Sequence, residues 1–482
     1  MKKQKGFRIE HDSLGEKQVP REAYYGIQTL RAVENFPVSG QGPFPEFVEA
    51  TVRVKRAAAK ANSALARYTG LDREKARAII RACEEVLSGK LREQFVVDIF
   101  QAGAGTSHHM NVNEVLANRA NEILGGKKGD YRPVHPNDHV NCGQSTNDVI
   151  PTAIRLAALA LVYGKPGGPS LFSALDGLAR GLGGKGREFD AVIKAGRTHL
   201  QDAVPVRLGQ EFAAWAEIVR EHRKRIAQAS RELFPLGLGG SATGTGLNTA
   251  PGYRELVARE LAGDMGLPLR PARDPIAAMM SMAPFVSLSG ALRNLAQDLG
   301  KIANDLRLLS SGPHTGLAEM NLPPVQPGSS IMPGKVNPVI AEMTNMVCFE
   351  VMGQDLVIAQ AAGAGQLELN VMMPVIAHAL LFSLKIMTNA LTLLSERCIK
   401  GITVDAERCG DYAERSLALA TALNPKIGFS RAAGFAKKAL ATGKTIRQVL
   451  EESGEFTEEE VERLLDLREM TEPHRKKRLR RK

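Results

Sequence analysis

Cysteine and tryptophan are scarce in this chain of 482 residues, which holds five cysteines and one tryptophan. The cysteines are odd in number, and no two of them form a Cys-x-x-Cys pair. The sequence therefore argues against a disulfide framework or a zinc site, and it fits a reducing compartment. Cys142 lies beside the polar residues 144–147, where a reactive thiol and a small buried hydrophobe are the alternatives, and we favour the second.

Long apolar runs are also lacking. We find no stretch of about 18 apolar residues, so no transmembrane helix is expected. Residues 1–6 are basic and polar residues follow them, whereas a secretory signal would need an apolar core at that place. These absences favour a cytoplasmic protein with no membrane partner.

Acidic residues are outnumbered, which gives a formal net charge of +11. Residues 474–482 alone carry seven Lys or Arg. Such a run either binds polyanions or forms a solvated end of the chain, and we favour the solvated end. No nucleic-acid partner is expected.

What the chain does have is a helical repeat of leucines. Residues 288–309 show leucine or isoleucine in alternating steps of four and three, and residues 208–226 repeat this spacing. Both stretches predict long helices with one apolar seam that pack in a bundle, with His222 inside the core. Alternation typical of strands is rare, and residues 7–10 are the best candidate. We predict a mainly α protein.

Glycine-rich stretches divide this pattern. Residues 164–169 predict a helix break, and the four glycines in residues 181–186 are a second candidate break, although a helix tolerates each Gly at a cost of about 1 kcal/mol. Residues 237–246 superficially resemble a phosphate-binding loop. They lack the Lys-Ser/Thr pair that follows in a P-loop, so no nucleotide site is predicted.

One segment punctuated by Gly and Pro, residues 328–338, gathers chemistry. Its Gly and Pro residues forbid a regular helix and favour a loop that can move. Lys335 supplies a point charge for an anion, and Asn337 and the neighbouring serines supply hydrogen bonds. The set suits a small carboxylate substrate, and it leaves one serine to act on a proton.

Residues 328–338 resemble the signature loop of the aspartase/fumarase superfamily, and the resemblance extends over nearly the whole chain. It implies a mainly α fold of three domains, with boundaries at 1–144, 145–402 and 403–482. The central domain would contribute long helices to a homotetrameric bundle, and each active site would draw on three subunits. The substrate implied is a small dicarboxylate, and no cofactor or metal is implied.

The resemblance also implies roles for individual residues. Ser329 would be the general base, Lys335 would stabilise the developing negative charge, and Glu342 would orient His199. The substrate-binding residues implied are Thr106, Ser107, Ser145, Thr146, Asn147, Thr198, Met332, Lys335 and Asn337. The sequence has His109 where the family commonly has Asn. His135 and His139 lie in a segment similar to a secondary anion site of fumarases, and Pro136 predicts a turn there rather than a helix or a metal site.

Four segments resemble the aspartase branch of the family more than class II fumarases: residues 24–31, 144–147, 304–313 and 365–372. Gly363, Met373 and His314 depart from the aspartase pattern. The function predicted is therefore a carbon–nitrogen lyase that converts L-aspartate reversibly to fumarate and ammonia. The alternatives are a class II fumarase, which interconverts malate and fumarate, and a non-catalytic relative that binds polyanions.

Overall fold

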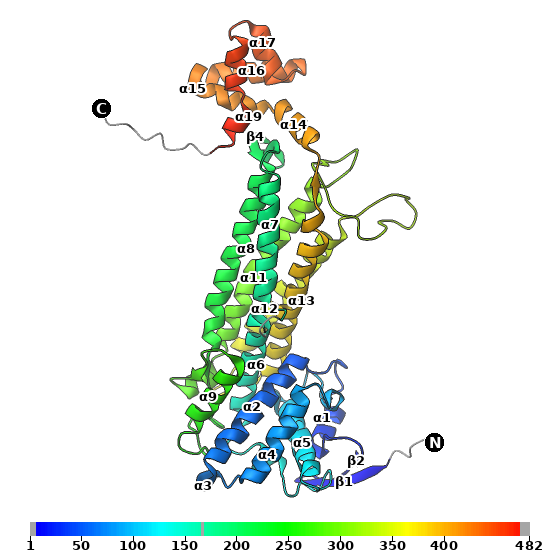
Figure 1. The fold of residues 1–482 in the computed structure, drawn as a ribbon, viewed down its shortest axis with the longest axis vertical. Helices are drawn as coiled ribbons and strands as arrows, with labels where there is room; N and C mark the ends of the chain where they lie inside the picture. The colour runs from blue at the N-terminus through cyan, green and yellow to red at the C-terminus, as the bar shows by residue number, and fades with distance from the viewer. Residues whose placement is uncertain (1–5, 165–167, 473–482) are drawn as a thin grey trace, which may run out of the picture. The chain divides into compact units, whose positions relative to one another are not determined.

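The computed structural model describes residues 6–164 and 168–472, which are mainly helical (Figure 1). The chain divides into two compact units. Unit 1 comprises residues 1–173, 222–296 and 348–388, and unit 2 comprises residues 174–221, 297–347 and 389–482. The basic run at residues 474–482 lies outside the described residues.

Three parts of unit 1 matter for the predicted site: an N-terminal hairpin, the helices around α2, and the first turns of α5 and α6. Its strands are β1 (Phe7–Asp12), β2 (Gly15–Pro20), β5 (Pro235–Leu236) and β6 (Arg270–Pro271). Its helices are α1 (Ile27–Asn35), α2 (Pro45–Ala64), α3 (Ala66–Thr69), α4 (Arg73–Leu87), α5 (Thr106–Ile123), α6 (Thr146–Tyr163), α9 (Tyr253–Met265) and α10 (Pro275–Met280). Short 3-10 or π turns lie at η1 (Arg92–Gln94), η2 (Gly103–Gly105), η3 (Pro136–Val140) and η4 (Arg231–Leu233).

Helices α2, α4 and α5 pack around one apolar core (Figure 1). Val52, Ile79 and Val115, one from each helix, are fully buried in it. Burial of a Val or Ile side chain stabilises a fold by roughly 1.5–3 kcal/mol, so this core fixes where α5 begins. The predicted strand at residues 7–10 is confirmed as part of β1, which pairs with β2 in an antiparallel hairpin.

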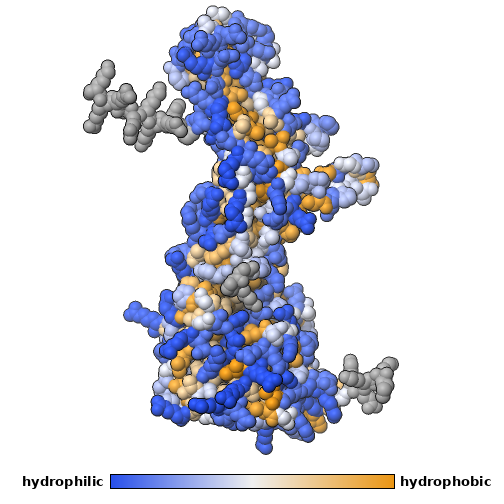
Figure 2. Space-filling view, in the orientation of Figure 1, coloured by the Kyte–Doolittle hydropathy of each residue, from blue (hydrophilic) through white to orange (hydrophobic). Residues whose placement is uncertain are grey.

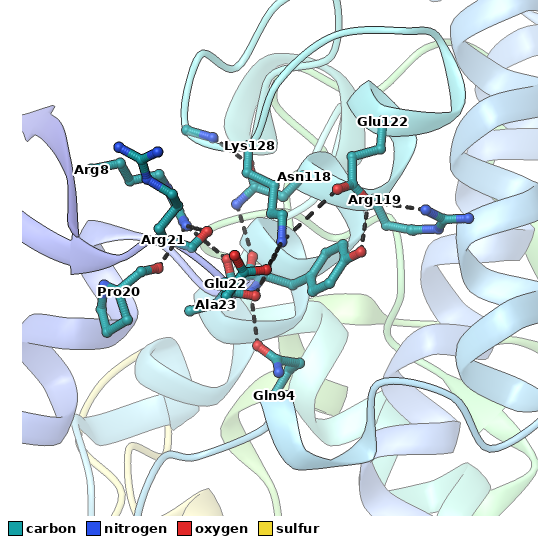
Figure 3. A network of polar contacts seen from close by, with 12 residues as sticks. Arg8, Pro20, Arg21, Glu22, Ala23, Gln94, Asn118, Arg119, Glu122 and Lys128 are labelled. Carbon is teal, nitrogen blue, oxygen red and sulfur yellow. Dashed lines mark hydrogen bonds and ion pairs between the residues drawn. The ribbon is translucent and has the colours of Figure 1, made fainter. Parts of the chain in front are cut away.

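The segment that leads into α1 is held by polar contacts from helices and loops of unit 1 (Figure 3). The Tyr24 backbone N–H donates to Gln94, and Asn118 donates to the Tyr24 carbonyl oxygen. Gly26 follows, and a Cβ atom there would lie 1.9 Å from the Tyr131 hydroxyl. Only glycine fits, because Glu114 must approach the backbone closely enough to accept from the Gly26 N–H at 2.9 Å.

Unit 2 contains two further strand pairs and a compact C-terminal group of helices. Its strands are β3 (Ile193–Thr198), β4 (Gln201–Arg207), β7 (Met320–Asn321) and β8 (Thr403–Val404). Its helices and 3-10 turns are η5 (Ile399–Gly401), α14 (Ala406–Arg415), η6 (Leu417–Leu423), α15 (Asn424–Ile427), α16 (Phe429–Thr442), α17 (Ile446–Ser453), α18 (Glu458–Leu464) and α19 (Leu467–Met470). Leu419, Ile446 and Leu450 are fully buried in the core of the C-terminal group.

Five long helices contribute residues to both units: α7 (Leu171–Glu188), α8 (Leu208–Ser230), α11 (Ala283–Leu309), α12 (Val339–Gly363) and α13 (Met373–Arg397). The predicted leucine seam of α11 is buried throughout, from Leu288 to Leu309. His222 on α8 is also buried, as the sequence predicts. The prediction of long helices with one apolar seam is confirmed.

The glycines at residues 181–186 do not interrupt α7, which runs unbroken to Glu188. The second candidate helix break is therefore not a break. One of its glycines, Gly186, packs closely against α8 within unit 2, where a Cβ atom on Gly209 would lie 2.4 Å from the carbonyl oxygen of Gly186.

Among the described residues, one helix, α13, is long and apolar enough to cross a membrane by length and composition. Residues 373–401 meet that test by length and composition, with a mean hydropathy of 1.4. In the structure, 56% of this window is buried. A buried core helix passes the same test, and the burial of Leu380, Leu384 and Leu391 is of that kind.

Candidate active site

Helix α5 begins at two of the predicted substrate-binding residues, Thr106 and Ser107. The preceding turn places Ala104 and Gly105 at positive φ, 61° and 88°, and α5 begins directly after it. The N–H groups in the first turn of a helix have no partner inside it and, with the helix dipole, favour a bound anion. Thr106 is exposed, and Ser107 is largely buried.

Helix α6 begins in the same way, at Thr146. Ser145 caps it and forms a capping box with Asp148. The side chain of each of these two residues accepts from the backbone N–H of the other. The amide nitrogen of Asn147 donates to the Ala242 carbonyl oxygen at 2.8 Å. The three predicted substrate-binding residues 145–147 therefore share the first turn of one helix.

A buried side-chain chain joins the two helix starts. The Nδ1 atom of His109, one turn into α5, lies 2.8 Å from the Thr146 hydroxyl. Its Nε2 atom lies 2.5 Å from the amine of Lys55 on α2, which is fully buried. Burial and the neighbouring Lys55 lower the pKa of His109 well below its usual range, so this imidazole is neutral at pH 7.

The glycine-rich residues 237–246 lie against this region. Gly239 and Ser241 donate their backbone N–H groups to Asp148, at 2.8 and 3.0 Å. Burial raises the pKa of Asp148 to about 6, while these hydrogen bonds oppose the shift. The segment thus serves as a support for the start of α6, in keeping with the prediction that it is no nucleotide site.

The signature loop in unit 2 is held at its two ends. The Gly328 N–H donates to the Lys335 carbonyl oxygen at 2.8 Å, and the Asn337 amide donates to the Gly328 carbonyl oxygen at 2.7 Å. A Cβ atom on Gly328 would lie 2.4 Å from that Lys335 oxygen, so glycine is required.

Between those ends the loop is open to solvent. The Ser329 hydroxyl accepts from the backbone N–H groups of Ile331 and Met332, at 3.2 and 3.0 Å. Ile331 is 83% exposed, and Lys335 is exposed as well. Figure 1 shows the loop leaving the helices of its unit, and Figure 2 shows hydrophobic side chains along it.

Two more predicted residues lie in the turn between β3 and β4. Thr198 pairs with Gln201, and the turn residues His199 and Leu200 have φ values of 55° and 60°. Two successive positive φ values match the turn that best joins antiparallel strands. His199 is exposed at the tip of this hairpin, where its side chain is free to reach a partner.

Arg197 anchors the end of β3. It donates to the fully buried Glu319 at 2.7 Å.

Glu342 lies in the first turn of α12, and its side chain makes no hydrogen bond or ion pair with the other described residues. The implied pairing of Glu342 with His199 therefore stays a prediction.

The structure brings the predicted residues together in two groups. Unit 1 gathers Thr106, Ser107, Ser145, Thr146 and Asn147. Unit 2 holds Thr198, His199, Ser329, Met332, Lys335, Asn337 and Glu342. Lys55 escaped the sequence analysis, although Thr51, Lys55 and Asn62 place polar residues at helical spacing on an otherwise alanine-rich face, which is a signal for a buried polar network.

The histidines near residue 135 differ from their prediction. Residues 136–140 form a π turn, capped by His135, so the two histidines do share a helical turn. The His135 N–H donates to the Nδ1 atom of His139 at 2.8 Å, which occupies that nitrogen. Within residues 6–164 and 168–472, no group of three or more His, Cys, Asp or Glu is arranged to hold a metal ion.

All five cysteines are free thiols. Four are buried, and Cys142 is half-buried beside the start of α6. Burial raises the pKa of the Cys142 thiol, which makes it a poor nucleophile at neutral pH.

Comparison with known proteins identifies the class. The family described as Lyase matches residues 15–353, and the family described as Fumarase C C-terminus matches residues 419–472. A relative named aspartate ammonia-lyase, from Pseudomonas aeruginosa, is 51% identical over 92% of this chain and 93% of its own length.

Two solved structures share the fold. A fumarate lyase:delta crystallin from Brucella melitensis, bound to cobalt, has a TM-score of 0.92 and 49% identity, over 97% of this chain and 100% of the other. A class II fumarase from Schistosoma mansoni has a TM-score of 0.93 and 36% identity, over the same shares. The predicted mainly α, aspartase/fumarase-like fold is confirmed.

The family match and the helical architecture are those of a lyase. More narrowly, the chain belongs to the aspartase/fumarase superfamily, with aspartate ammonia-lyases among the relatives that match nearly its whole length.

Proposed function

We propose that this protein is a carbon–nitrogen lyase that converts L-aspartate reversibly to fumarate and ammonia. The observation that carries the proposal is the 51% identity with a bacterial aspartate ammonia-lyase, against 36% with a class II fumarase. Since that class II fumarase shares the fold with a TM-score of 0.93, the fold alone does not choose between the two reactions.

The reaction removes a proton from the carbon beside one carboxylate while ammonia leaves the adjacent carbon. That carbon acid is weak, so the charge that develops on the carboxylate must meet preorganised donors. In our proposal Ser329 takes the proton, and Lys335, Asn337 and the loop's backbone N–H groups stabilise the charge. A serine hydroxyl is a weak base at pH 7, so the loop must close over the substrate and exclude water.

The starts of α5 and α6 would hold the other carboxylate. Thr106, Ser107, Ser145, Thr146 and Asn147 all lie in the first turns of these helices or cap them. Free N–H groups, hydroxyls and helix dipoles together favour a dianionic substrate there. No cofactor takes part, because conjugation in fumarate supplies the driving force.

The remaining predicted residues would come from other copies of the chain. We place Thr198, His199 and Met332 at the substrate, with Glu342 fixing the tautomer of His199 and raising its basicity. The exposed positions of His199 and Lys335 are compatible with that arrangement, because each is free to enter a site formed with another subunit.

A homotetramer with shared active sites follows from this assignment. Helix α12 supports it, since Met346, Phe349 and Leu356 lie at helical spacing and are 66%, 64% and 61% exposed. An exposed apolar helix face of this kind marks a protein interface. We also propose the three-domain division at residues 144 and 402 and a cytoplasmic location.

Parallel assays with L-aspartate and L-malate test the reaction, with fumarate absorbance as the readout. We expect fumarate from L-aspartate at a rate at least a hundredfold above that from L-malate. Fumarate from malate alone would instead support the second candidate, a class II fumarase. Gly363, Met373 and His314, which depart from the aspartase pattern, are the observation that keeps this candidate in the comparison.

A further inference from the structure

The amine of Lys55 has three hydrogen-bond acceptors around it, and all of them belong to unit 1. It donates to the side-chain oxygens of Asn141 and Gln144, each at 2.9 Å, and it lies 2.5 Å from the Nε2 atom of His109. A lysine ammonium has three N–H donors and no acceptor. The three contacts therefore use its whole donor capacity.

The orientation of the two amides is fixed independently of Lys55. The side-chain amide nitrogen of Gln144 donates to the backbone carbonyl oxygens of Val140 and Cys142. The side-chain amide nitrogen of Asn141 donates to the backbone carbonyl oxygen of Gln144. Each amide nitrogen faces a carbonyl, so each amide oxygen must face Lys55. The direction of these two bonds is set by the backbone.

The direction of the bond to His109 then follows. A charged Lys55 donates to the Nε2 atom, so the single proton of the neutral imidazole sits on Nδ1. That Nδ1–H donates to the Thr146 hydroxyl oxygen, 2.8 Å away. Because the hydroxyl oxygen already accepts this bond, its own proton points elsewhere.

We propose that His109 is a positioning residue that makes the Thr146 hydroxyl a donor toward a substrate carboxylate. Because buried Lys55 donates to the Nε2 atom of His109, the Nδ1–H group of His109 donates to Thr146 at the start of α6. The inference rests on the proposed function for the dicarboxylate substrate, but it concerns the direction of one hydrogen bond rather than the leaving group.

Burial makes this chain of hydrogen bonds selective. Lys55 and His109 are 0% and 1% exposed, so water does not compete for either of these hydrogen bonds. An inward-pointing Thr146 proton would present oxygen lone pairs to an anion and weaken its binding. The family's Asn at this place keeps the same capacity, because an amide also accepts with oxygen and donates with nitrogen.

His108 provides a matched control. It is equally buried, it precedes His109 on α5, and its Nε2 atom contacts the Thr51 hydroxyl at 3.0 Å. Its ring stacks on Phe47, with 4.4 Å between ring centroids. It thus shares the burial of His109 but has no contact with Thr146.

The test compares KM and kcat for L-aspartate in the wild type and four variants. His109→Leu should raise KM about tenfold and change kcat less than threefold, since it removes the donor to Thr146 but leaves the loop base in place. His109→Asn should keep KM within threefold of the wild type. His108→Gln should keep it within twofold. Thr146→Val should raise it as much as His109→Leu does.

A double-mutant cycle decides whether the two residues act together. The double variant His109→Leu/Thr146→Val should be no worse than either single variant, because both changes remove the same donor. Unchanged KM in folded His109→Leu, or effects that multiply in the double variant, would overturn the proposal. If His109→Leu does not fold, Lys55→Met/His109→Leu, which also removes the unpaired charge, is measured in its place.

A separate measurement keeps this inference distinct from the proposed function. The dissociation constant of succinate, a dicarboxylate without a leaving group, is measured by calorimetry on the same proteins. A wild type that binds succinate but does not deaminate L-aspartate would contradict the proposed function alone. Equal succinate affinity in the wild type and His109→Leu would contradict the role of His109 alone.

Discussion

The first turns of α5 and α6 and the loop at residues 328–337 both present hydroxyls and amides, yet they are held in opposite ways. Around Thr146 the hydrogen bonds join side chains of different helices, and one buried series of them reaches back through His109 to Lys55 on α2. Around Ser329 the hydrogen bonds stay within the loop itself, and the tip is exposed. The first region is fixed by contacts between helices, whereas the loop is held by contacts within itself, which suits the movement proposed for it.

In the proposed reaction this difference would separate two tasks that catalysis demands. Binding a carboxylate needs donors already aimed, since reorganising them later would cost binding energy. Deprotonating a carbon acid needs a site without water, and a segment that covers the substrate only after it binds provides that. A rigid region should therefore lose stability when altered, and the loop should lose activity.

Ser329→Ala gives the largest expected effect. Removing the proposed base should lower kcat at least a thousandfold, because general-base catalysis alone contributes about 10²–10⁴-fold. The midpoint of urea unfolding should stay within error of the wild type, since the hydroxyl bonds only to its own loop. Fumarate formation and circular dichroism measure the two quantities, and a rate near the wild type would assign the base to another group.

Gln144→Leu tests the rigid region. This near-isosteric change removes the bonds to Lys55, Val140 and Cys142, and should lower the free energy of unfolding by about 2–3 kcal/mol. Urea denaturation measures it. Asn337→Ala is the loop's counterpart and should cost less than about 1 kcal/mol, because the Gly328 carbonyl that it leaves can turn to solvent. Equal losses in both variants would remove the distinction between the regions.

The pH dependence of binding gives the smallest effect. Burial lowers the pKa of Lys55 to about 7, and the titratable groups acting on it are Asp148 from α6, Cys83 from α4, and His108 and His109 from α5. Below pH 7 the charged amine donates to His109. Above pH 7 the neutral amine can accept instead, which reverses the chain and turns the Thr146 proton inward.

Succinate inhibition measures this reversal. The inhibition constant of the wild type should rise about threefold to tenfold between pH 6.5 and 8.5, a range in which both succinate carboxylates stay ionised. In His109→Leu the constant should be higher and flat, because the connection to Lys55 is cut. A flat profile in the wild type would show that Lys55 keeps one protonation state throughout.

The sequence predicted the helical scaffold well because its signals are local. The seam at residues 288–309 repeats with the period of a helix, and each seam residue is buried. Family motifs likewise named candidate substrate-binding residues, which the structure places at the starts of α5 and α6. These predictions need only spacing along the chain.

Predictions failed where a partner distant in sequence decides the outcome. The glycines at residues 181–186 are a candidate helix break in the sequence, but α7 continues through them, and Gly186 meets Gly209 of α8. Lys55 and His109 are 54 residues apart, and nothing local links them.

The tie between Gly328 and residues 335–337 has a practical consequence. Because Gly328 is hydrogen-bonded to Lys335 and Asn337, the two ends of the loop are already close together. In the proposed closing, the loss of conformational entropy would therefore fall mainly on the few residues at the tip of the loop. A fluorescent or spin label at Ile331, which is 83% exposed, would then report the proposed closing of the loop without disturbing the hydrogen bonds at its two ends.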